Sequence, residues 1–265
     1  MIVSLSLSRA RIKVSSALQR FFSTRATDRI IQSKARGKLV QYNKSISVLA
    51  AAEIAEQKVE LAVVDLEPAK SRYATNDRYG LEASQLAAVK WAAGTSTLVF
   101  KSNIKTYGNV DPHIAERVGI TNDLTATLPS FADMHKAFYH AVSDADYLAF
   151  YSAANDVRAL SNMYCLAGNP QPGLSLPILD IFPIARLVDN VETHKLADVA
   201  KYYGIDLSGT FHTADYDALV TSEMLSPLCE DVATRNQSTL NEHIPPLLLF
   251  SSSHIGRIPS FIKKK

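Results

Sequence analysis

The chain has 265 residues, of which 47% are hydrophobic and 20% are charged, a composition typical of a globular protein with a sizeable core. No apolar run approaches the roughly 20 residues that a membrane-spanning helix needs, so no membrane partner is expected. The two cysteines, Cys165 and Cys229, lack the spacing of a zinc site, and neither a zinc cluster nor a disulfide framework is expected.

A net charge of +2 conceals an uneven distribution of charge along the chain. Residues 1–44 carry ten Lys/Arg against one acidic residue, and residues 233–265 carry five against one. The body between them is therefore acidic, with eleven more acidic than basic residues. This argues against a broad basic nucleic-acid surface on the body. It fits acidic residues gathered around metal ions, with basic ends that help to hold a polyanion.

The first 27 residues contain no acidic residue and mix Arg and Ser with apolar residues. This composition resembles a mitochondrial transit peptide, and a basic arm of a bacterial or phage protein is the alternative. The expected location is mitochondrial in the first case and cytoplasmic in the second. Residues 28–57 are helix-prone and end in an Ala-rich run. Residues 1–57 are thus predicted to be a basic arm or targeting segment followed by a helix.

An α/β pattern begins at residue 58. The apolar run Leu61–Leu66 predicts a buried strand that ends at Asp65 and Glu67. Two more strands are predicted at 82–92 and 96–103, with Gly94 and Thr95 as a hairpin turn. Three successive strands without helices predict an antiparallel meander at the start of a mixed sheet.

Helices and strands alternate after the meander. Pro112 and Gly119 suit the start and end of a helix, and a second helix begins at Pro129–Ser130. The remaining segments are predicted as strands at 147–151 and 176–182 and helices at 154–167, 183–189, 194–203 and 212–231. Residues 58–232 therefore form the predicted folded domain, and 233–265 a basic tail broken by Pro and Ser.

Three groups of acidic residues accompany these elements. Asp65 and Glu67 are two apart on a strand and should point to the same side, where each raises the pKa of the other unless a cation lies between them. Asp156 opens the helix after the strand at 147–151. His212 and Asp217 open the last helix, and they share a face only if His212 precedes its first regular turn.

Each residue also has a purely structural interpretation. Asp65 and Glu67 alone could be solvated, Asp156 could complement a helix dipole, Asp217 could be a solvated helix residue, and His212 could cap the helix. Asp180 and Asp215 are expected to be structural. The combination of the groups decides between the two interpretations.

In combination, the motifs resemble the DEDDh (DnaQ-like) 3′→5′ exonuclease superfamily, which includes the epsilon proofreading subunit of DNA polymerase III. The family pattern is Asp-x-Glu on the first strand, Asp after the fourth, and His-x-Ala-x-x-Asp-Ala at the last helix. The chain matches it, in order, over about residues 58–231. The matching residues are Asp65, Glu67, Asp156, His212, Ala214, Asp217 and Ala218.

The resemblance implies an RNase H-like α/β fold with a five-stranded mixed sheet flanked by helices. It also implies two Mg²⁺ or Mn²⁺ ions held by Asp65, Glu67, Asp156 and Asp217, with His212 as proton acceptor. Carboxylates suit these ions, and two ions roughly 4 Å apart stabilise both the attacking and the leaving oxygen of a phosphodiester. The expected product is a nucleoside 5′-monophosphate released from a 3′ end.

The chain departs from the family after Glu67 and before Asp156. Pro68-Ala69-Lys70 replaces the usual Thr-Thr-Gly or Thr-Ser-Gly, whose Thr helps to hold the terminal nucleotide. We therefore expect the family's chemistry with an altered grip on the substrate. The expected substrate is a single-stranded or frayed 3′ end of DNA, with a DNA polymerase subunit as a candidate partner. Short RNA, or a non-catalytic role as a polymerase-associated binding module, is the alternative.

Overall fold

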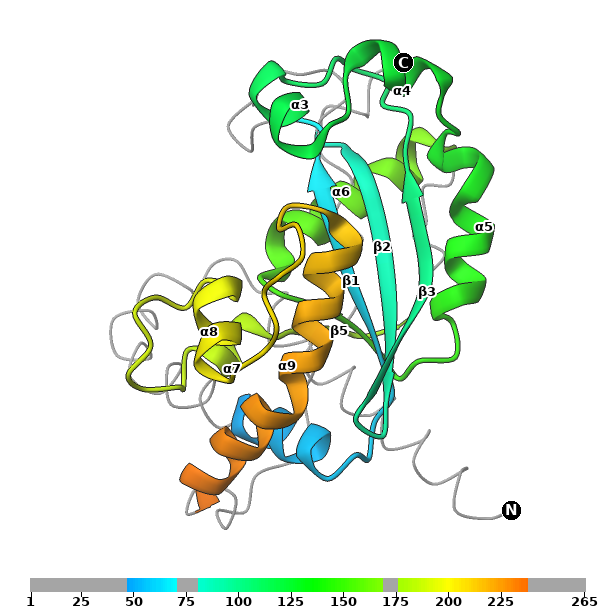
Figure 1. The fold of residues 1–265 in the computed structure, drawn as a ribbon. Coiled ribbons are helices and arrows are strands. Elements are labelled where there is room, and N and C mark those ends of the chain that lie inside the picture. The colour runs from blue at the N-terminus through cyan, green and yellow to red at the C-terminus, as the bar shows by residue number, and fades with distance from the viewer. Residues whose placement is uncertain (1–46, 71–80, 169–175, 238–265) are drawn as a thin grey trace, which may run out of the picture.

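A computed structural model describes residues 47–70, 81–168 and 176–237 (Figure 1). Its centre is a five-stranded mixed sheet in the order β3-β2-β1-β4-β5. The strands are β1 (Leu61–Pro68), β2 (Ala83–Ala92), β3 (Thr95–Asn103), β4 (Tyr147–Phe150) and β5 (Ile178–Asp180). β2 pairs antiparallel with β1 and β3, whereas β4 pairs parallel with β1 and β5. The predicted α/β fold with a mixed sheet and an opening meander is confirmed.

The hairpin turn between β2 and β3 lies one residue earlier than predicted. Ala93 and Gly94 form it, with φ values of 49° and 75°, and Thr95 already pairs with Ala92. A two-residue turn with positive φ at both positions matches the twist of the flanking strands, whereas a β-branched Thr favours the strand.

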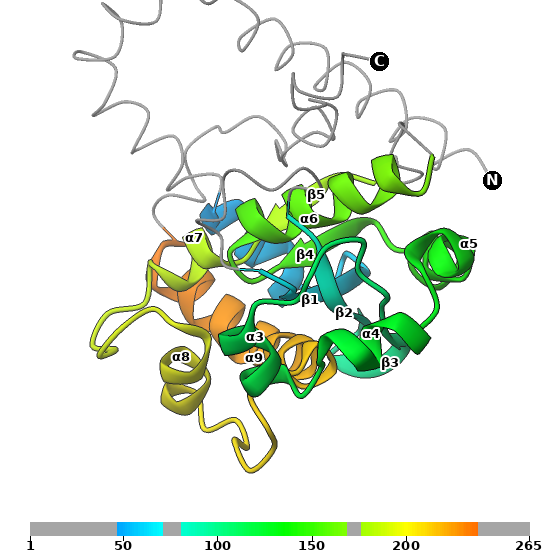
Figure 2. The ribbon, with the colours of Figure 1, turned by 90° about the horizontal axis from the view of Figure 1, so that it is seen from above.

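Seven labelled helices surround the sheet in the described part of the chain, and α9 and α6 lie on opposite faces of it (Figure 2). The helices are α3 (Pro112–Val118), α4 (Asn122–Thr127), α5 (Phe131–Val142), α6 (Ala153–Leu166), α7 (Phe182–Ala185), α8 (Leu196–Tyr202) and α9 (Ala214–Arg235). An unlabelled helix spans residues 47–55. The helix predicted at 183–189 corresponds to the shorter α7, and the strand predicted at 176–182 to the shorter β5. The sequence did not predict α4, because this helix has too few turns for apolar periodicity to reveal it.

The alternation of side chains along β1 decides on which face its carboxylates lie. Leu61 and Val63 belong to the core on the α9 side, and Val64 and Leu66 to the core on the α5 and α6 side. Because side chains of a strand alternate between faces, Asp65 and Glu67 continue the row of Leu61 and Val63. The pair therefore lies on the face that α9 covers.

The helix at residues 47–55 belongs to the same core as α9. Its Val48, Ala51 and Ile54 are buried there. The predicted transit peptide or basic arm, residues 71–80 after β1 and nearly all of the basic tail lie outside the described residues. Within the described residues, no helix has the length and apolarity needed to cross a membrane.

Candidate active site

The end of β1 forms the floor of the candidate active site. Asp65 pairs in register with Ala87 of β2, and Glu67 with Gln85. The pairing shifts between Glu67 and Pro68, as at a β-bulge, which bends a strand and redirects its side chains. The Glu67 residue is only 4% exposed. The strand thus holds an acidic pair in a largely buried place.

The start of α6 brings Asp156 to the same end of the sheet. β4 runs parallel to β1, so the carboxyl ends of both strands lie at one edge, and α6 begins three residues after β4. The backbone turns at Ser152, which has a left-handed conformation with φ 69° and ψ 63°. Asp180 accepts the backbone N–H of Ser152 at 3.2 Å and that of Phe182 at 3.1 Å. Asp180 therefore stabilises the turn that positions Asp156, in keeping with the structural role expected of it.

The start of α9 supplies the remaining two residues. The helix begins at Ala214, so His212 precedes its first turn, with a φ of 65°. The backbone N–H of His212 donates to Asp217 Oδ2 at 3.3 Å, and that of Ala214 donates to Gln85 Oε1 at 3.2 Å. The geometric condition for His212 and Asp217 to share a face is met. Gln85 ties the helix start to the strand beside Glu67.

The structure brings all five predicted residues together. Glu67, His212 and Asp217 form the tightest group, and each offers a ligand atom within 4.8 Å of the others. Asp65 lies on the same face of β1 as Glu67, and the charges of Asp156, Glu67 and Asp217 raise its pKa, as expected of four carboxylates that lie close together. One histidine and four carboxylates thus converge from β1, α6 and α9.

Burial makes full ionisation of these carboxylates unfavourable. It raises the pKa of Glu67 to about 7 and that of Asp217 to about 6. Burial also raises the pKa of Asp65 well above its ordinary value, and the charges of Asp156, Glu67 and Asp217 raise it further. The pKa of Asp156 is raised by burial and then by the charges of Glu67 and Asp180. A bound cation would reverse these shifts.

One oxygen of the cluster has no partner among the described residues. Asp217 Oδ1 is buried and accepts no hydrogen bond, whereas Oδ2 accepts from His212. A buried carboxylate oxygen without a donor is costly unless a cation binds it. The oxygen-rich donor set and the unpaired Oδ1 fit a hard divalent cation such as Mg²⁺ or Mn²⁺.

His212 is suited to accept a proton near neutral pH. Partial burial, and then the charge of Arg117, lower the pKa of His212 below its ordinary value of 6.5. The imidazole is therefore neutral at pH 7 and able to take up a proton.

Reasoning from the sequence did not identify Arg117 and Gln85 at the site, nor the buried Glu82, which binds the chain before α3. Arg117 Nη2 lies 3.6 Å from Glu67 Oε2. Gln85 fixes the start of α9, and the buried Glu82 accepts the backbone N–H groups of Tyr107 and Gly108 at 2.7 and 3.0 Å. All three act through contacts distant in sequence, and neither spacing nor periodicity reveals such contacts.

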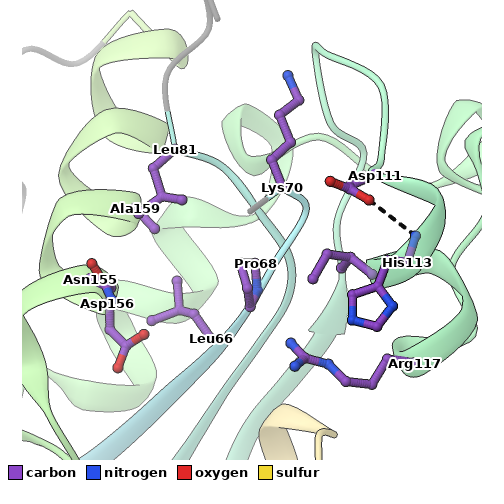
Figure 3. A pocket seen from close by; sticks show the side chains of 11 residues that line it. Leu66, Pro68, Lys70, Leu81, Asp111, His113, Arg117, Asn155, Asp156 and Ala159 are labelled. Atoms are coloured by element: carbon purple, nitrogen blue, oxygen red, sulfur yellow. Dashed lines mark hydrogen bonds between the residues drawn. The ribbon is translucent and has the colours of Figure 1, made fainter. Parts of the chain in front are cut away.

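A cavity of about 360 Å³ opens beside the carboxylates (Figure 3). Pro68, Asp156 and Arg117 line it, from β1, α6 and α3 respectively. Its wall also includes Lys70 and His113. Asp156 borders the space on one side, and Arg117 and His113 lie with Asp111 on the other. The guanidinium of Arg117 is suited to a ligand that carries phosphate.

Comparison with known proteins agrees with this geometry. The family model described as "Exonuclease" matches residues 66–225. A DNA polymerase III of the PolC type from Oceanobacillus iheyensis is 28% identical over 164 residues, which cover 60% of this chain and 11% of that polymerase. The chain thus corresponds to a small part of that relative.

Solved structures show the same fold at low sequence identity. Exonuclease X in complex with 5′ overhanging duplex DNA matches 64% of this chain and 92% of its own, with a TM-score of 0.50 and 15% identity. The nuclease domain of 3′hExo, a DEDDh family member bound to rAMP, matches 67% of this chain and 92% of its own, with a TM-score of 0.52 and 14% identity. These matches support the RNase H-like fold that the motifs implied.

Proposed function

The chain belongs to the exonuclease family, and we propose that it is a metal-dependent 3′→5′ exonuclease that releases nucleoside 5′-monophosphates from DNA. The observation that carries the proposal is the buried cluster in which Glu67, His212 and Asp217 each offer a ligand atom within 4.8 Å of the others, while Asp217 Oδ1 lacks a partner among the described residues. Such a cluster reduces the stability of a metal-free protein and is suited to a cation. The exonuclease domain proposed for this activity spans residues 58–232, and the helix at residues 47–55 packs into its core.

Asp65, Glu67, Asp156 and Asp217 would hold two divalent ions, Mg²⁺ or Mn²⁺. Bound there, the ions supply positive charge to the attacking and leaving oxygens of the phosphodiester. The strand and the two helix starts fix the carboxylates before substrate arrives, which favours electrostatic stabilisation without reorganisation.

His212 would take the proton of the attacking water. Its backbone N–H is held by Asp217, which fixes the residue at the junction before α9 while the side chain stays exposed. A neutral imidazole at this place accepts a proton at neutral pH and returns it to solvent.

The similarity to a PolC-type DNA polymerase III favours DNA as the substrate of this chain and a DNA polymerase subunit as its partner. Short RNA is the second candidate, because the fold is also that of 3′hExo, whose structure holds rAMP. A role as a non-catalytic binding module is disfavoured, because all five proposed catalytic residues are present and lie close together. The proposed location is mitochondrial if residues 1–27 act as a transit peptide, and otherwise cytoplasmic.

The direct test uses the full-length protein with Mg²⁺ on single-stranded DNA and RNA that carry a 5′ label. Degradation from the 3′ end gives a ladder of shortened labelled strands, whereas degradation from the 5′ end releases the label first as a mononucleotide. Asp65→Asn should abolish the ladder, and Asp189→Asn, at an exposed position outside the cluster, should leave it unchanged. No shortening of either substrate, or equal activity of Asp65→Asn and wild type, would overturn the proposal.

A further inference from the structure

Arg117 is a cation at the edge of the acidic cluster, and no motif predicted it. Its side chain extends from the last turn of α3 into the cavity toward β1 (Figure 3). The guanidinium Nη2 lies 3.6 Å from Glu67 Oε2. The charge of Arg117 lowers the pKa values of Glu67, Asp217 and His212. Arg117 therefore acts electrostatically on all three residues of the tightest group in the cluster.

The contact between Arg117 and Glu67 is too weak to be a structural ion pair. A separation of 3.6 Å lies beyond hydrogen-bond length, and only one guanidinium nitrogen takes part. The Arg117 side chain is 35% exposed and that of Glu67 only 5%, so solvent screens the pair from the side of the guanidinium. The planar guanidinium carries five N–H donors suited to two-point binding of phosphate.

The position of Arg117 is nevertheless well fixed. Asp111 caps α3 by accepting the N–H of His113, and Ile114 and Val118 pack in a small core with Ala69. The backbone N–H of Asp111 also donates to the carbonyl of Ala69 at 2.9 Å. α3 is thus attached to the chain directly after β1, and the base of the Arg117 side chain is held next to the site.

Neither Pro68 nor Ala69 offers a donor to a phosphate. Pro68 has neither an N–H nor a hydroxyl group, and the N–H of Ala69 donates to the carbonyl of Glu82 at 2.8 Å. Lys70, the next residue along the chain, lies 4.0 Å from the buried carboxylate of Glu82, so a substrate bound at the carboxylates draws on a donor from another element. Arg117 lines the same cavity as Asp156 and provides one.

We propose that Arg117 binds the phosphate of the substrate at the carboxylate cluster, and that it rests on Glu67 only while no cation is bound there. This inference rests on the proposed function, since the bound group is a phosphate held next to the metal-binding carboxylates. A divalent cation at Glu67 repels the guanidinium, and a phosphate oxygen is the acceptor that satisfies both cations. Arg117 is in this sense a substrate-binding residue supplied by α3 in place of the strand end.

The test compares Arg117→Gln, Arg117→Lys and the control Lys136→Gln, which removes an exposed charge from α5. With Mg²⁺ and single-stranded DNA, Arg117→Gln should raise KM roughly 10- to 100-fold, as expected for a lost charge-assisted bond to phosphate. The slope of log affinity against log salt should fall by about 0.7, the value for one lost phosphate contact on a single strand. Arg117→Lys should give an intermediate KM, and Lys136→Gln the wild-type value.

Calorimetry with Mn²⁺ alone distinguishes this role from a merely structural one. Removal of a competing cation should make Arg117→Gln bind Mn²⁺ severalfold more tightly than wild type does. An unchanged KM and salt slope in Arg117→Gln would overturn the inference. Weaker Mn²⁺ binding would also overturn it, because Arg117 would then serve to position Glu67.

Binding of dAMP and AMP in the presence of Mn²⁺ separates the inference from the proposed function. If wild type shortens no nucleic acid but binds either nucleotide in a manner that depends on Arg117, the proposed function fails and the inference stands. If wild type is active and Arg117→Gln binds both nucleotides as wild type does, the inference fails and the proposed function stands.

Discussion

The backbone N–H of His212 donates to Asp217 Oδ2, while the other oxygen of the same carboxylate is buried and unpaired among the described residues. One hydrogen bond thus links the proposed proton acceptor to a proposed metal ligand and leaves one oxygen free for the ion. The same bond holds the conformation of the chain before α9, and because its donor is the backbone of His212, the side chain at position 212 can be changed without removing it.

His212→Asn should lower kcat by about two to four orders of magnitude, the range expected for loss of a general base. Asn tolerates the left-handed backbone of position 212, so the fold and the KM for DNA should stay near wild type. Steady-state kinetics with Mg²⁺ checks this, with His140→Asn, at an exposed position on α5, as the control. A variant that keeps most of its kcat would show that another group accepts the proton.

Asp217→Asn should stabilise the metal-free protein at pH 8 and abolish activity. The pKa of Asp217 is raised from 3.8 to about 6, so the ionised side chain destabilises the fold, and the amide removes this charge. Discounted for partial exposure, the gain in the free energy of unfolding is about 1 kcal/mol. Urea unfolding in EDTA measures it, and a loss of stability would contradict the electrostatic explanation.

The metal-free protein should become less stable as pH rises between about 4 and 7. The pKa values of Glu67 and Asp217 are higher in the folded than in the unfolded chain, so the folded state binds more protons in this range. Their stabilising contribution is complete below the unfolded pKa values and is lost as pH rises through the folded ones. Thermal unfolding in EDTA at a series of pH values tests this slope, and Asp217→Asn should flatten it.

Mg²⁺ or Mn²⁺ should raise the unfolding temperature, and more so at pH 8 than at pH 5. A ligand that binds only the folded state stabilises it by mass action, and protons compete with the ion for the same carboxylates. Asp65→Asn should reduce the shift, whereas Asp189→Asn should retain it. An equal shift at both pH values would contradict binding at groups with raised pKa values.

Glu82→Gln should destabilise the fold by about 1–3 kcal/mol, because buried backbone donors lose their acceptor. The carboxylate accepts the N–H groups of Tyr107 and Gly108 and lies 4.0 Å from Lys70 Nζ. An amide keeps one acceptor oxygen and turns an NH₂ group toward a donor. Urea unfolding checks the change, with Glu116→Gln, exposed on α3, as the comparison.

The sequence predicted the elements with strong periodicity and the residues that carry chemistry. The meander, α5, α6 and α9 lie close to the predicted ranges because their apolar patterns or end signals are strong. Asp65 and Glu67 share a face because the side chains of a strand alternate, and this geometry follows from their spacing of two residues alone.

Contacts between distant segments could not be predicted in the same way. Gln85 meets Ala214 and Arg117 meets Glu67 only after β2, α3 and α9 have packed. The short α4 and the exact turn at Ala93–Gly94 depend on local backbone geometry to which apolar periodicity is insensitive. Sequence motifs thus identified the proposed ligands, and the folded structure was needed to show what surrounds them.

The left-handed backbone conformation of Ser152 and His212 lowers the stability of the fold next to the proposed active site. Each residue precedes a helix that carries a proposed metal ligand, and a non-glycine residue in this conformation costs about 1–2 kcal/mol. A screen for thermal stability would therefore favour glycine at both positions, but glycine at 212 would remove the proposed proton acceptor. Selection for heat resistance would favour glycine at position 212, whereas selection for nuclease activity would retain the histidine. Glycine at position 152 would raise stability without removing a proposed catalytic group.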